Sequence, residues 1–294
     1  MSVLGTVGFV WRHPLNARGG TGGCLRALQR FLRWQCVARL APGVVAMPFV
    51  NGTSLFMKRG MTGATGNWYC GLHEPDEMGF ALHYLRPGDL FVDVGANVGS
   101  YTILVAGGVG ARVVSVEPIP ATFRSLEDNV RLNRLDARVD CHCIGIADQP
   151  GILRFSSTDD TMNRIVEADG EGVISVEVET VDGLLEGNCP MLMKIDVEGH
   201  EHKVLSGAAS TLRDSRLGVV LMETNGLSDN LGHTKESLTD IMRGLGFTLC
   251  HYDAVRRELM PGQRGNNSIF VRDVESARAR CRDARRYMLV NGTI

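Results

Sequence analysis

The chain has 294 residues, of which 44% are hydrophobic and 22% are charged, close to the averages of globular proteins. This composition excludes a disordered chain, a collagen-like chain and a coiled coil. The net charge of −2 is unevenly distributed, because residues 1–60 carry eight basic and no acidic side chains and residues 61–271 have a net charge of −13. A body this acidic is not expected to bind nucleic acid, whereas the basic segment suits an anionic partner.

The first 60 residues predict an appendage made of a loose arm, a helix and a hairpin. Residues 1–23 are glycine-rich and aperiodic, which predicts the arm. Residues 24–40 predict an amphipathic helix, with apolar side chains at helical spacing at Leu25, Leu28, Leu32, Cys36 and Leu40. Two apolar runs then flank Asn51-Gly52, a dipeptide typical of a type I′ hairpin turn. We expect the leucines to pack on the body while the arginines cover an acidic rim or a neighbouring subunit. The alternative is contact with an anionic acceptor or a membrane surface.

From residue 75 onward, short apolar strands alternate with helices, a pattern that predicts a parallel sheet covered on both faces. Seven strands are expected, over residues 90–95, 112–118, 138–146, 191–197, 217–224, 246–253 and 267–273. The last two lack an intervening helix, which predicts an antiparallel hairpin at one edge. An insertion at about 150–188 contains two strand-like runs, Gly151–Phe155 and Val173–Val181. We therefore divide the chain into the appendage, residues 1–60, and an α/β domain, residues 61–294.

Candidate binding residues follow the strands, because open α/β sheets bind ligands at the carboxyl ends of their strands. The first strand leads into the sequence DVGANVG, residues 93–99, whose glycines permit a tight turn before a helix. The second strand ends in Glu117, at a distance along the chain that suits hydrogen bonding to ribose hydroxyls. The turn departs from the dinucleotide fingerprint G-x-G-x-x-G. The Asp93 carboxylate would repel a pyrophosphate, but it would favour a cationic ligand such as the ammonium and sulfonium of S-adenosylmethionine.

The chain resembles the FkbM family of S-adenosylmethionine-dependent methyltransferases in three segments: FVDVGANVGSYTIL, VVSVEP and KIDVEGHEHKVLSGA. The resemblance runs from about Tyr69 to Phe270. It implies a class I methyltransferase fold, which is Rossmann-like and doubly wound, here with a mixed seven-stranded sheet. It also implies O-methylation, often of sugar hydroxyls on natural products or cell-surface glycans. Methylation of an amide, phenol or nucleoside, a nucleotide-dependent oxidoreductase and a cofactor-binding protein without catalysis stay open as alternatives.

The resemblance also implies which residues bind the cofactor. The motif after the first strand would hold its methionine end, through Asp93, Gly95, Asn97 and Gly99. Glu117 would hold the ribose, and Asp148, after the third strand, would hold the adenine amino group. Glu74 would reach the cofactor or close over it, and it is equally expected as a charge at the N-terminus of a helix.

The fourth strand carries the candidate catalytic residues. Lys194, Asp196 and Glu198 alternate along it and therefore point to one side, with Asp196 at the rim of the sheet. A sugar hydroxyl needs a proton acceptor, and Asp196, Glu198 or His200 is expected to serve. His200 is the natural base by its ordinary pKa. A carboxylate would serve if burial raised its pKa.

The same acids permit a metal site as an alternative. Asp196, Glu198 and Glu223 offer the oxygen ligands that Mg²⁺ prefers. Such an ion would orient a vicinal diol and lower its pKa. We expect a reaction without a metal, in which Glu223 and Asn225, at the end of the fifth strand, contact a small-molecule or glycan acceptor.

The cysteines and the hydropathy pattern bear on location. The eight cysteines form no C-x-x-C pair, which argues against a zinc site or a disulfide framework, and no apolar run reaches transmembrane length. We expect a cytoplasmic protein, with contact of the basic segment with the inner face of a membrane as the alternative. A homo-oligomer is compatible with this pattern.

Overall fold

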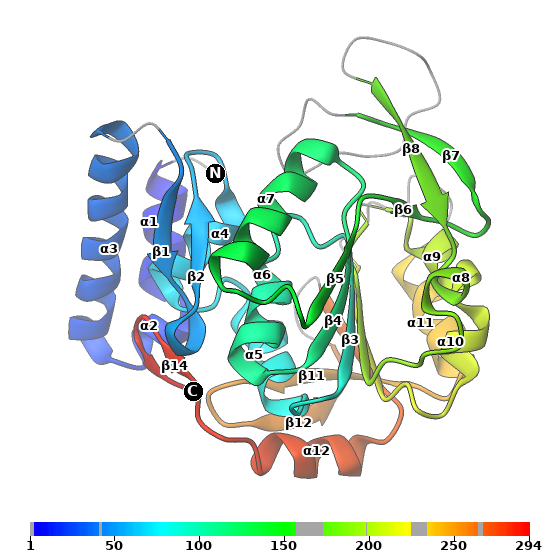
Figure 1. The fold of residues 1–294 in the computed structure, drawn as a ribbon. Coiled ribbons are helices and arrows are strands. Elements are labelled where there is room, and N and C mark those ends of the chain that lie inside the picture. Colours follow the sequence, from blue (N-terminus) through cyan, green and yellow to red (C-terminus); the bar gives the residue numbers. More distant parts are fainter. Residues whose placement is uncertain (1–2, 41–42, 157–172, 198, 225–233, 264–266) are drawn as a thin grey trace.

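The computed structural model describes residues 3–40, 43–156, 173–197, 199–224, 234–263 and 267–294. Eight strands form its central sheet: β3 (Leu90–Val94), β4 (Arg112–Val116), β5 (Val139–His142), β9 (Leu192–Ile195), β10 (Val219–Glu223), β11 (Thr248–Asp253), β12 (Glu258–Pro261) and β13 (Asn267–Val271). Their order is β12-β11-β13-β10-β9-β3-β4-β5 (Figure 1). The five strands from β10 to β5 are parallel, and β13, β11 and β12 form an antiparallel edge.

This strand order confirms the expected class I methyltransferase fold. The chain runs outward from β3 to β5 and then returns to β9 on the other side of β3. Helices that follow β3 and β9 therefore leave in opposite directions, and a crevice opens at the carboxyl ends of these two strands. The sheet thus positions a ligand site before any side chain is considered.

The sheet has one strand more than the seven that the sequence predicts. β12 pairs with β11 at the outer edge, starting from Asp253 opposite Glu258. The sequence did not predict β12 because the strand contains Pro261. Proline has no N–H for the ladder and argues against a strand inside a sheet, but an edge strand such as β12 tolerates it. The third expected strand, 138–146, is also shorter than predicted, because β5 ends at His142 and β6 (Gly145–Ile146) joins a separate sheet.

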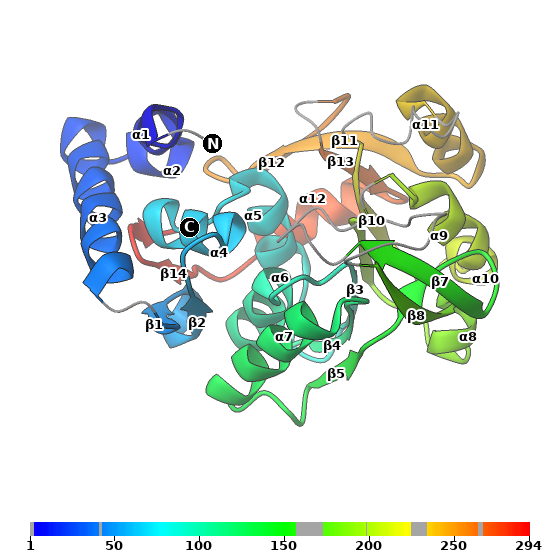
Figure 2. The same ribbon diagram turned by 90° about the horizontal axis from the view of Figure 1, so that it is seen from above.

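Helices cover both faces of the central sheet (Figures 1 and 2). One face is covered by α5 (Pro75–Tyr84), α6 (Ser100–Ile103), the π-helical segment Leu104–Val109 that continues it, and α7 (Pro120–Leu132). The other face is covered by α8 (Val181–Leu185), α9 (Glu201–Gly207), α10 (Ala209–Arg213) and α11 (Lys235–Gly244). α12 (Val274–Arg282) packs on α5 and β12. Neighbouring strand residues divide between the two cores, as Phe91 and Val92 do on β3.

The insertion forms the two predicted strands. β7 (Gly151–Ser156) pairs antiparallel with β8 (Val173–Glu179), and β6 adds to β8 as a third strand. The second run ends two residues earlier than expected, because Thr180 caps α8 by accepting a hydrogen bond from the Gly183 N–H. Residues 157–172 lie outside the described part of the chain.

The predicted loose arm, residues 1–23, is wrong. The segment forms α1 (Val3–Arg12), α2 (Pro14–Ala17) and the start of α3 (Gly20–Leu40), and the helix expected from residue 24 begins four residues earlier. Packing overrides the low helix propensity of glycine here. The Asn16 amide donates to the carbonyl of Val10 at 3.0 Å, and a Cβ on Gly23 would lie 2.3 Å from the Asn16 carbonyl. Close approach of α2 and α3 therefore requires Gly23.

The face of α3 that packs is not the predicted one. Small and aromatic side chains are buried there, namely Gly23, Cys24, Ala27, Phe31 and Trp34. Of the predicted apolar residues, Leu28 alone is partly buried, whereas Leu25, Leu32, Cys36 and Leu40 are exposed. Both sets have helical spacing, so periodicity could not choose between them.

The predicted hairpin and its turn are confirmed. β1 (Val45–Pro48) pairs antiparallel with β2 (Ser54–Met57). Asn51 and Gly52 have φ values of +48° and +82°, and positive φ at both positions is what a type I′ turn requires. β2 is fixed to α7, because the Phe56 N–H donates to the Asn129 side chain at 2.7 Å.

α3 is joined to the domain through α4 (Thr62–Cys70), a helix that the sequence did not predict. Arg30 donates to the carbonyl of Tyr69 at 2.7 Å, and the indole N–H of Trp68 donates to the carbonyl of Arg30 at 3.2 Å. Buried residues of α3 and of the central sheet belong to one hydrophobic core. The division at residue 60 stays a prediction. Within the described residues, none of the helices has the length and apolar character that crossing a membrane requires.

Candidate active site

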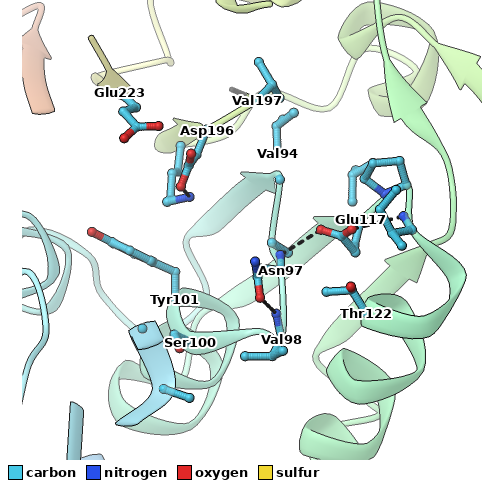
Figure 3. Close-up of a pocket in the computed structure, with 18 of the residues that line it drawn as sticks. Val94, Asn97, Val98, Ser100, Tyr101, Glu117, Thr122, Asp196, Val197 and Glu223 are labelled. Atoms are coloured by element: carbon cyan, nitrogen blue, oxygen red, sulfur yellow. Dashed lines mark hydrogen bonds and ion pairs between the residues drawn. The ribbon is translucent and has the colours of Figure 1, made fainter. Parts of the chain in front are cut away.

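A cavity of about 340 Å³ lies at the carboxyl ends of β3, β4 and β9 (Figure 3). The turn after β3, residues of α4 and α6, and His200, just before α9 (Glu201–Gly207), contribute to its wall. Glu117 and Thr122 lie at one end, and Tyr101, Asp196 and Glu223 lie at the other (Figure 3). The volume is within the range of small-molecule and cofactor pockets, about 300–1,000 Å³.

The turn after β3 brings main chain to the cavity. Gly95 has a φ of +77°, and a Cβ there would lie 1.8 Å from the carbonyl oxygen of Asp196, so only glycine fits. Asn97 has a φ of +52°, and its side-chain oxygen accepts a hydrogen bond from the Val98 N–H at 2.7 Å. Because these contacts fix the turn, the main chain of residues 95–97 is held at the cavity wall.

Glu117 is held by main-chain donors. One carboxylate oxygen accepts from the Asn97 N–H and the other from the Ile119 N–H, both at 3.0 Å. Burial raises the pKa of Glu117 to about 7, although both hydrogen bonds act to lower it. A carboxylate has about four acceptor positions, so each oxygen can still accept from a ligand. Two neighbouring hydroxyls, as on a ribose, match this arrangement.

The opposite end of the cavity is built around an ion pair between the buried Lys194 and the half-buried Asp196. The Lys194 ammonium lies 2.8 Å from Asp196 Oδ2, 3.9 Å from Asp93 Oδ1 and 5.0 Å from the centre of the Tyr101 ring. Burial acts to raise the pKa of Asp196, but the ammonium outweighs burial and holds this pKa below its ordinary value. Asp196 is therefore ionised at neutral pH. The carboxylate of Glu223 lies beside it (Figure 3).

Glu74 closes this end of the cavity from the start of α5. Its Oε2 accepts from the Tyr101 hydroxyl at 2.8 Å, and its Oε1 accepts from the Asn267 amide at 3.1 Å. The residue thus links α5, α6 and β13 across the cavity wall. Its predicted contact with a cofactor stays a prediction.

His200 lies just before α9 and lines the cavity. Burial, together with the nearby Lys203 ammonium, lowers the pKa of His200 below its ordinary value, so the imidazole is neutral at pH 7. Within the described part of the chain, its Nδ1 is buried without a hydrogen-bond partner. A neutral imidazole with an unpaired ring nitrogen is able to accept a proton.

Three predicted residues do not line the cavity: Asp93, Gly99 and Asp148. Asp93 is fully buried, and its Oδ2 accepts from the Thr102 hydroxyl at 2.8 Å. It lies opposite Lys194 in the β3–β9 register, with its side chain toward α6. Gly99 precedes α6 with a φ of +87°, and Asp148 is exposed beyond β6. Glu198 and Asn225 lie outside the described residues.

Two residues of the site, Lys194 and Tyr101, belong to the sequence motifs, but the sequence predicted no function for them. Lys194 shares a face of its strand with Asp196, which the alternation showed, but its contact with Asp93 depends on β9 lying beside β3. Tyr101 follows the glycine turn, in the first turn of α6. The spacing of an aromatic residue there gave no signal of its contacts with Glu74 and Lys194.

A metal site is not apparent among the residues that the structure describes. No three of their His, Cys, Asp or Glu side chains are grouped as ligands of a metal ion. Glu198, one of the three predicted ligands, is outside those residues, so the predicted set stays untested.

The sequence profile of the methyltransferase FkbM domain matches residues 93–249, more than half of the chain. The chain belongs to the FkbM methyltransferase family. The matched region begins at Asp93 in β3 and ends in β11, and it therefore contains Glu117, Asp196 and His200.

Two methyltransferases are similar to this chain in sequence. The hexuronic acid methyltransferase AglP of Haloferax volcanii is 28% identical over 150 residues, covering 50% of this chain and 61% of AglP. The 31-O-demethyl-FK506 methyltransferase FkbM of Streptomyces tacrolimicus is 27% identical over 201 residues, covering 56% of this chain and 75% of that protein.

Two solved structures match part of this chain at low sequence identity and low TM-score. TYW2 of P. horikoshii in complex with MeSAdo is 14% identical with a TM-score of 0.42, covering 78% of this chain and 69% of that chain. The precorrin-6y C5,15-methyltransferase of Geobacter metallireducens is 15% identical with a TM-score of 0.38, covering 66% and 84%.

Proposed function

We propose that this protein transfers a methyl group from S-adenosylmethionine to a hydroxyl of a sugar or of a glycosylated small molecule. One observation carries the proposal: a single cavity has a main-chain-bound carboxylate, Glu117, at one end, and both Asp196 and His200 in its wall. The names of the two relatives support it, since one is a hexuronic acid methyltransferase and the other a 31-O-demethyl-FK506 methyltransferase.

The residues at the Glu117 end fit the nucleoside part of the cofactor. Glu117 accepts from the ribose hydroxyls with the acceptor positions that the main chain leaves free. Ile119, Ile144 and Ile146 line the cavity near Glu117 and offer apolar surface to the adenine. The main chain of residues 95–97 faces the methionine part. When bound, S-adenosylmethionine supplies an electrophilic methyl group on a sulfonium.

The residues at the Asp196 end fit the acceptor. The Lys194 ammonium stabilises the charge of Asp196, so this residue is a carboxylate. It accepts a hydrogen bond from the acceptor hydroxyl and thereby orients the hydroxyl oxygen. We assign proton acceptance to His200, because its imidazole is neutral and lines the cavity, whereas the Asp196 carboxylate is already paired with the Lys194 ammonium. Glu223, beside Asp196, contacts a further hydroxyl of the acceptor.

The proposed reaction needs no metal ion, since alignment and a proton acceptor are enough for an in-line methyl transfer. A chelator should therefore leave turnover unchanged. Turnover that EDTA abolishes and Mg²⁺ restores would replace this assignment with the metal site of Asp196, Glu198 and Glu223.

The test uses S-adenosylmethionine with a tritiated methyl group and the purified full chain. Candidate acceptors are hexuronic acids, oligosaccharides that contain them, and glycosylated natural products, with a phenol, an amide and a nucleoside as comparison acceptors. The proposal predicts tritium in a sugar-containing product, attached through oxygen. Label in the comparison acceptors alone would contradict the acceptor class. Tight binding of S-adenosylhomocysteine without transfer to any acceptor would favour a cofactor-binding protein without catalysis.

A further inference from the structure

The outer surface of α1 and α3 concentrates exposed apolar side chains. Eleven large hydrophobic residues are exposed in the described part of the chain, and seven of them lie between residues 3 and 44. Leu32 and Leu40 on α3 are 60% and 85% exposed, and Leu4 on α1 is 84% exposed. α1 and α3 pack side by side, with α3 outermost in both views (Figures 1 and 2). This concentration is unlike the scattered exposed apolar residues of an ordinary surface.

The exposed apolar residues of α3, together with Cys36, form one stripe along the helix. At about 100° per residue, Leu25, Leu32, Cys36 and Leu40 fall within about 80° of arc along a helix about 31 Å long. The opposite side of α3 is filled by its contacts with the rest of the molecule, through residues such as Phe31 and Trp34. The stripe is therefore a second apolar face, additional to the one that holds the helix in place.

Exposed arginines flank this stripe. Arg26 and Arg33 lie on one side of it and Arg39 on the other, whereas Arg30 points inward and binds the Tyr69 carbonyl. Residues 1–60 contain no acidic side chain that could neutralise them. None of the ion pairs within the described residues involves residues 3–60. The face is thus both apolar and positively charged.

We propose that the α1–α3 face binds the surface of a bilayer that contains anionic phospholipids. An apolar stripe bordered by arginines is the pattern of a helix that lies in the plane of a membrane interface, with its leucines among the acyl chains and its guanidinium groups among the headgroup phosphates. A second copy of the chain fits less well, because a symmetric contact would place the two sets of arginines together without any acid. A nucleic acid offers the phosphates but no partner for the leucines.

Such binding would place the cavity near the membrane surface. α4 packs against α3 on one side, and its residues Thr62, Gly63, Ala64 and Asn67 line the cavity on the other. The inference does not depend on the proposed methyl transfer, because lipid binding is measured without cofactor or acceptor.

The first experiment measures sedimentation of the full chain with phospholipid vesicles. Wild type should bind vesicles that contain about one-third phosphatidylglycerol, bind phosphatidylcholine vesicles at least tenfold more weakly, and lose anionic binding as salt is raised to about 0.5 M. The triple variant Leu25→Asn/Leu32→Asn/Leu40→Asn should lose at least tenfold in affinity. A matched control, Ile152→Asn/Ile241→Asn/Met288→Asn, removes exposed apolar residues elsewhere and should bind like wild type.

A second variant set tests the charges. Arg26→Gln/Arg33→Gln/Arg39→Gln should weaken binding to anionic vesicles at least tenfold and reduce its salt dependence. The control Arg131→Gln/Arg243→Gln/Arg256→Gln removes three exposed arginines of the domain, with side chains 59%, 69% and 72% exposed, and should not change binding. Melting temperature and S-adenosylhomocysteine binding check that each variant is folded.

Four outcomes would overturn the proposal. Wild type that stays in solution with anionic vesicles at low salt contradicts it directly. Equal binding by the leucine variant and its control would show that this face is not the contact. A dimer in light scattering that the leucine variant converts to a monomer, without vesicle binding by wild type, would identify a self-association surface. Binding of an oligonucleotide but not vesicles would assign the arginines to nucleic acid.

Discussion

The two ends of the cavity hold a carboxylate in opposite ways, Glu117 in a buried position and Asp196 in a half-buried one. Glu117 at the end of β4 is held by two main-chain N–H groups, and burial raises its pKa to about 7. Asp196 after β9 is held by the Lys194 ammonium, which keeps its pKa below the ordinary value. Main-chain N–H groups hold the Glu117 carboxylate in place without adding a full charge nearby, whereas the Lys194 ammonium keeps the Asp196 carboxylate ionised. The first arrangement suits binding, and the second suits chemistry at an acceptor.

The largest expected effect on stability comes from removing the Lys194 ammonium, the positive charge at the Asp196 end of the cavity. Lys194→Met would leave the fully buried Asp93 and the half-buried Asp196 without their cation, at a cost of about 3–5 kcal/mol in the free energy of unfolding at neutral pH. The loss should be smaller at about pH 4, because carboxylates with raised pKa values then bind protons in the folded state. Urea unfolding at the two pH values measures it.

A matched variant separates charge from packing in this comparison. Lys194→Met combined with Asp93→Asn and Asp196→Asn removes the acids together with their cation, and should recover most of the lost stability. If the triple variant is as unstable as Lys194→Met, then packing around the lysine stem, and not the unpaired carboxylates, accounts for the loss.

The comparison also shows what a sequence can predict. The Glu117 end was predicted because its residues, the glycine turn and the acid after the next strand, belong to consecutive elements. The Asp196 end was predicted in part, since the contact of Lys194 with Asp93 joins strands that are neighbours in the sheet and distant in the chain. That pairing follows from the strand order, which local patterns do not contain.

The prediction for the N-terminal helices was wrong for a related reason. Glycine content predicted an arm over residues 1–23, but burial of Val10 and Leu15 and the hydrogen bonds of Asn16 outweigh the weak propensity of the segment. On α3, the small and aromatic stripe packs instead of the leucine stripe. Periodicity identified the helix but not the face that it buries, because that depends on how closely α2 and α4 approach.

The next largest effect tests proton acceptance. His200→Gln should lower turnover about 100-fold or more, the range for a lost general base, while S-adenosylhomocysteine affinity changes little. Wild-type turnover should fall as pH decreases through the lowered pKa of His200, because protonation removes the acceptor nitrogen. Steady-state kinetics across pH measures both. An acid limb that persists unchanged in His200→Gln would return the role to Asp196 or Glu198.

The pH dependence of cofactor binding sharpens the contrast from the Glu117 end. Because the pKa of Glu117 is raised to about 7, lowering the pH protonates the carboxyl and weakens its acceptance from ribose hydroxyls. Affinity for S-adenosylhomocysteine should fall up to about tenfold between about pH 8 and pH 6. Glu117→Gln carries no titrating group there and should show a flat profile. Fluorescence or calorimetric titration at several pH values compares them, and parallel profiles would show that another group titrates.

The most direct test of this division is calorimetric titration of S-adenosylhomocysteine into Glu117→Ala and Asp196→Asn, each beside wild type. Glu117→Ala removes two hydrogen-bond acceptors for the ribose, each contributing about 1.5–3 kcal/mol when charged, so affinity should fall at least tenfold. Asp196→Asn should stay within about threefold of wild-type affinity, while turnover falls about 100-fold because the acceptor hydroxyl is no longer oriented. Unchanged affinity in Glu117→Ala, or a loss in Asp196→Asn as large as in Glu117→Ala, would contradict the assignment of binding to one end and chemistry to the other.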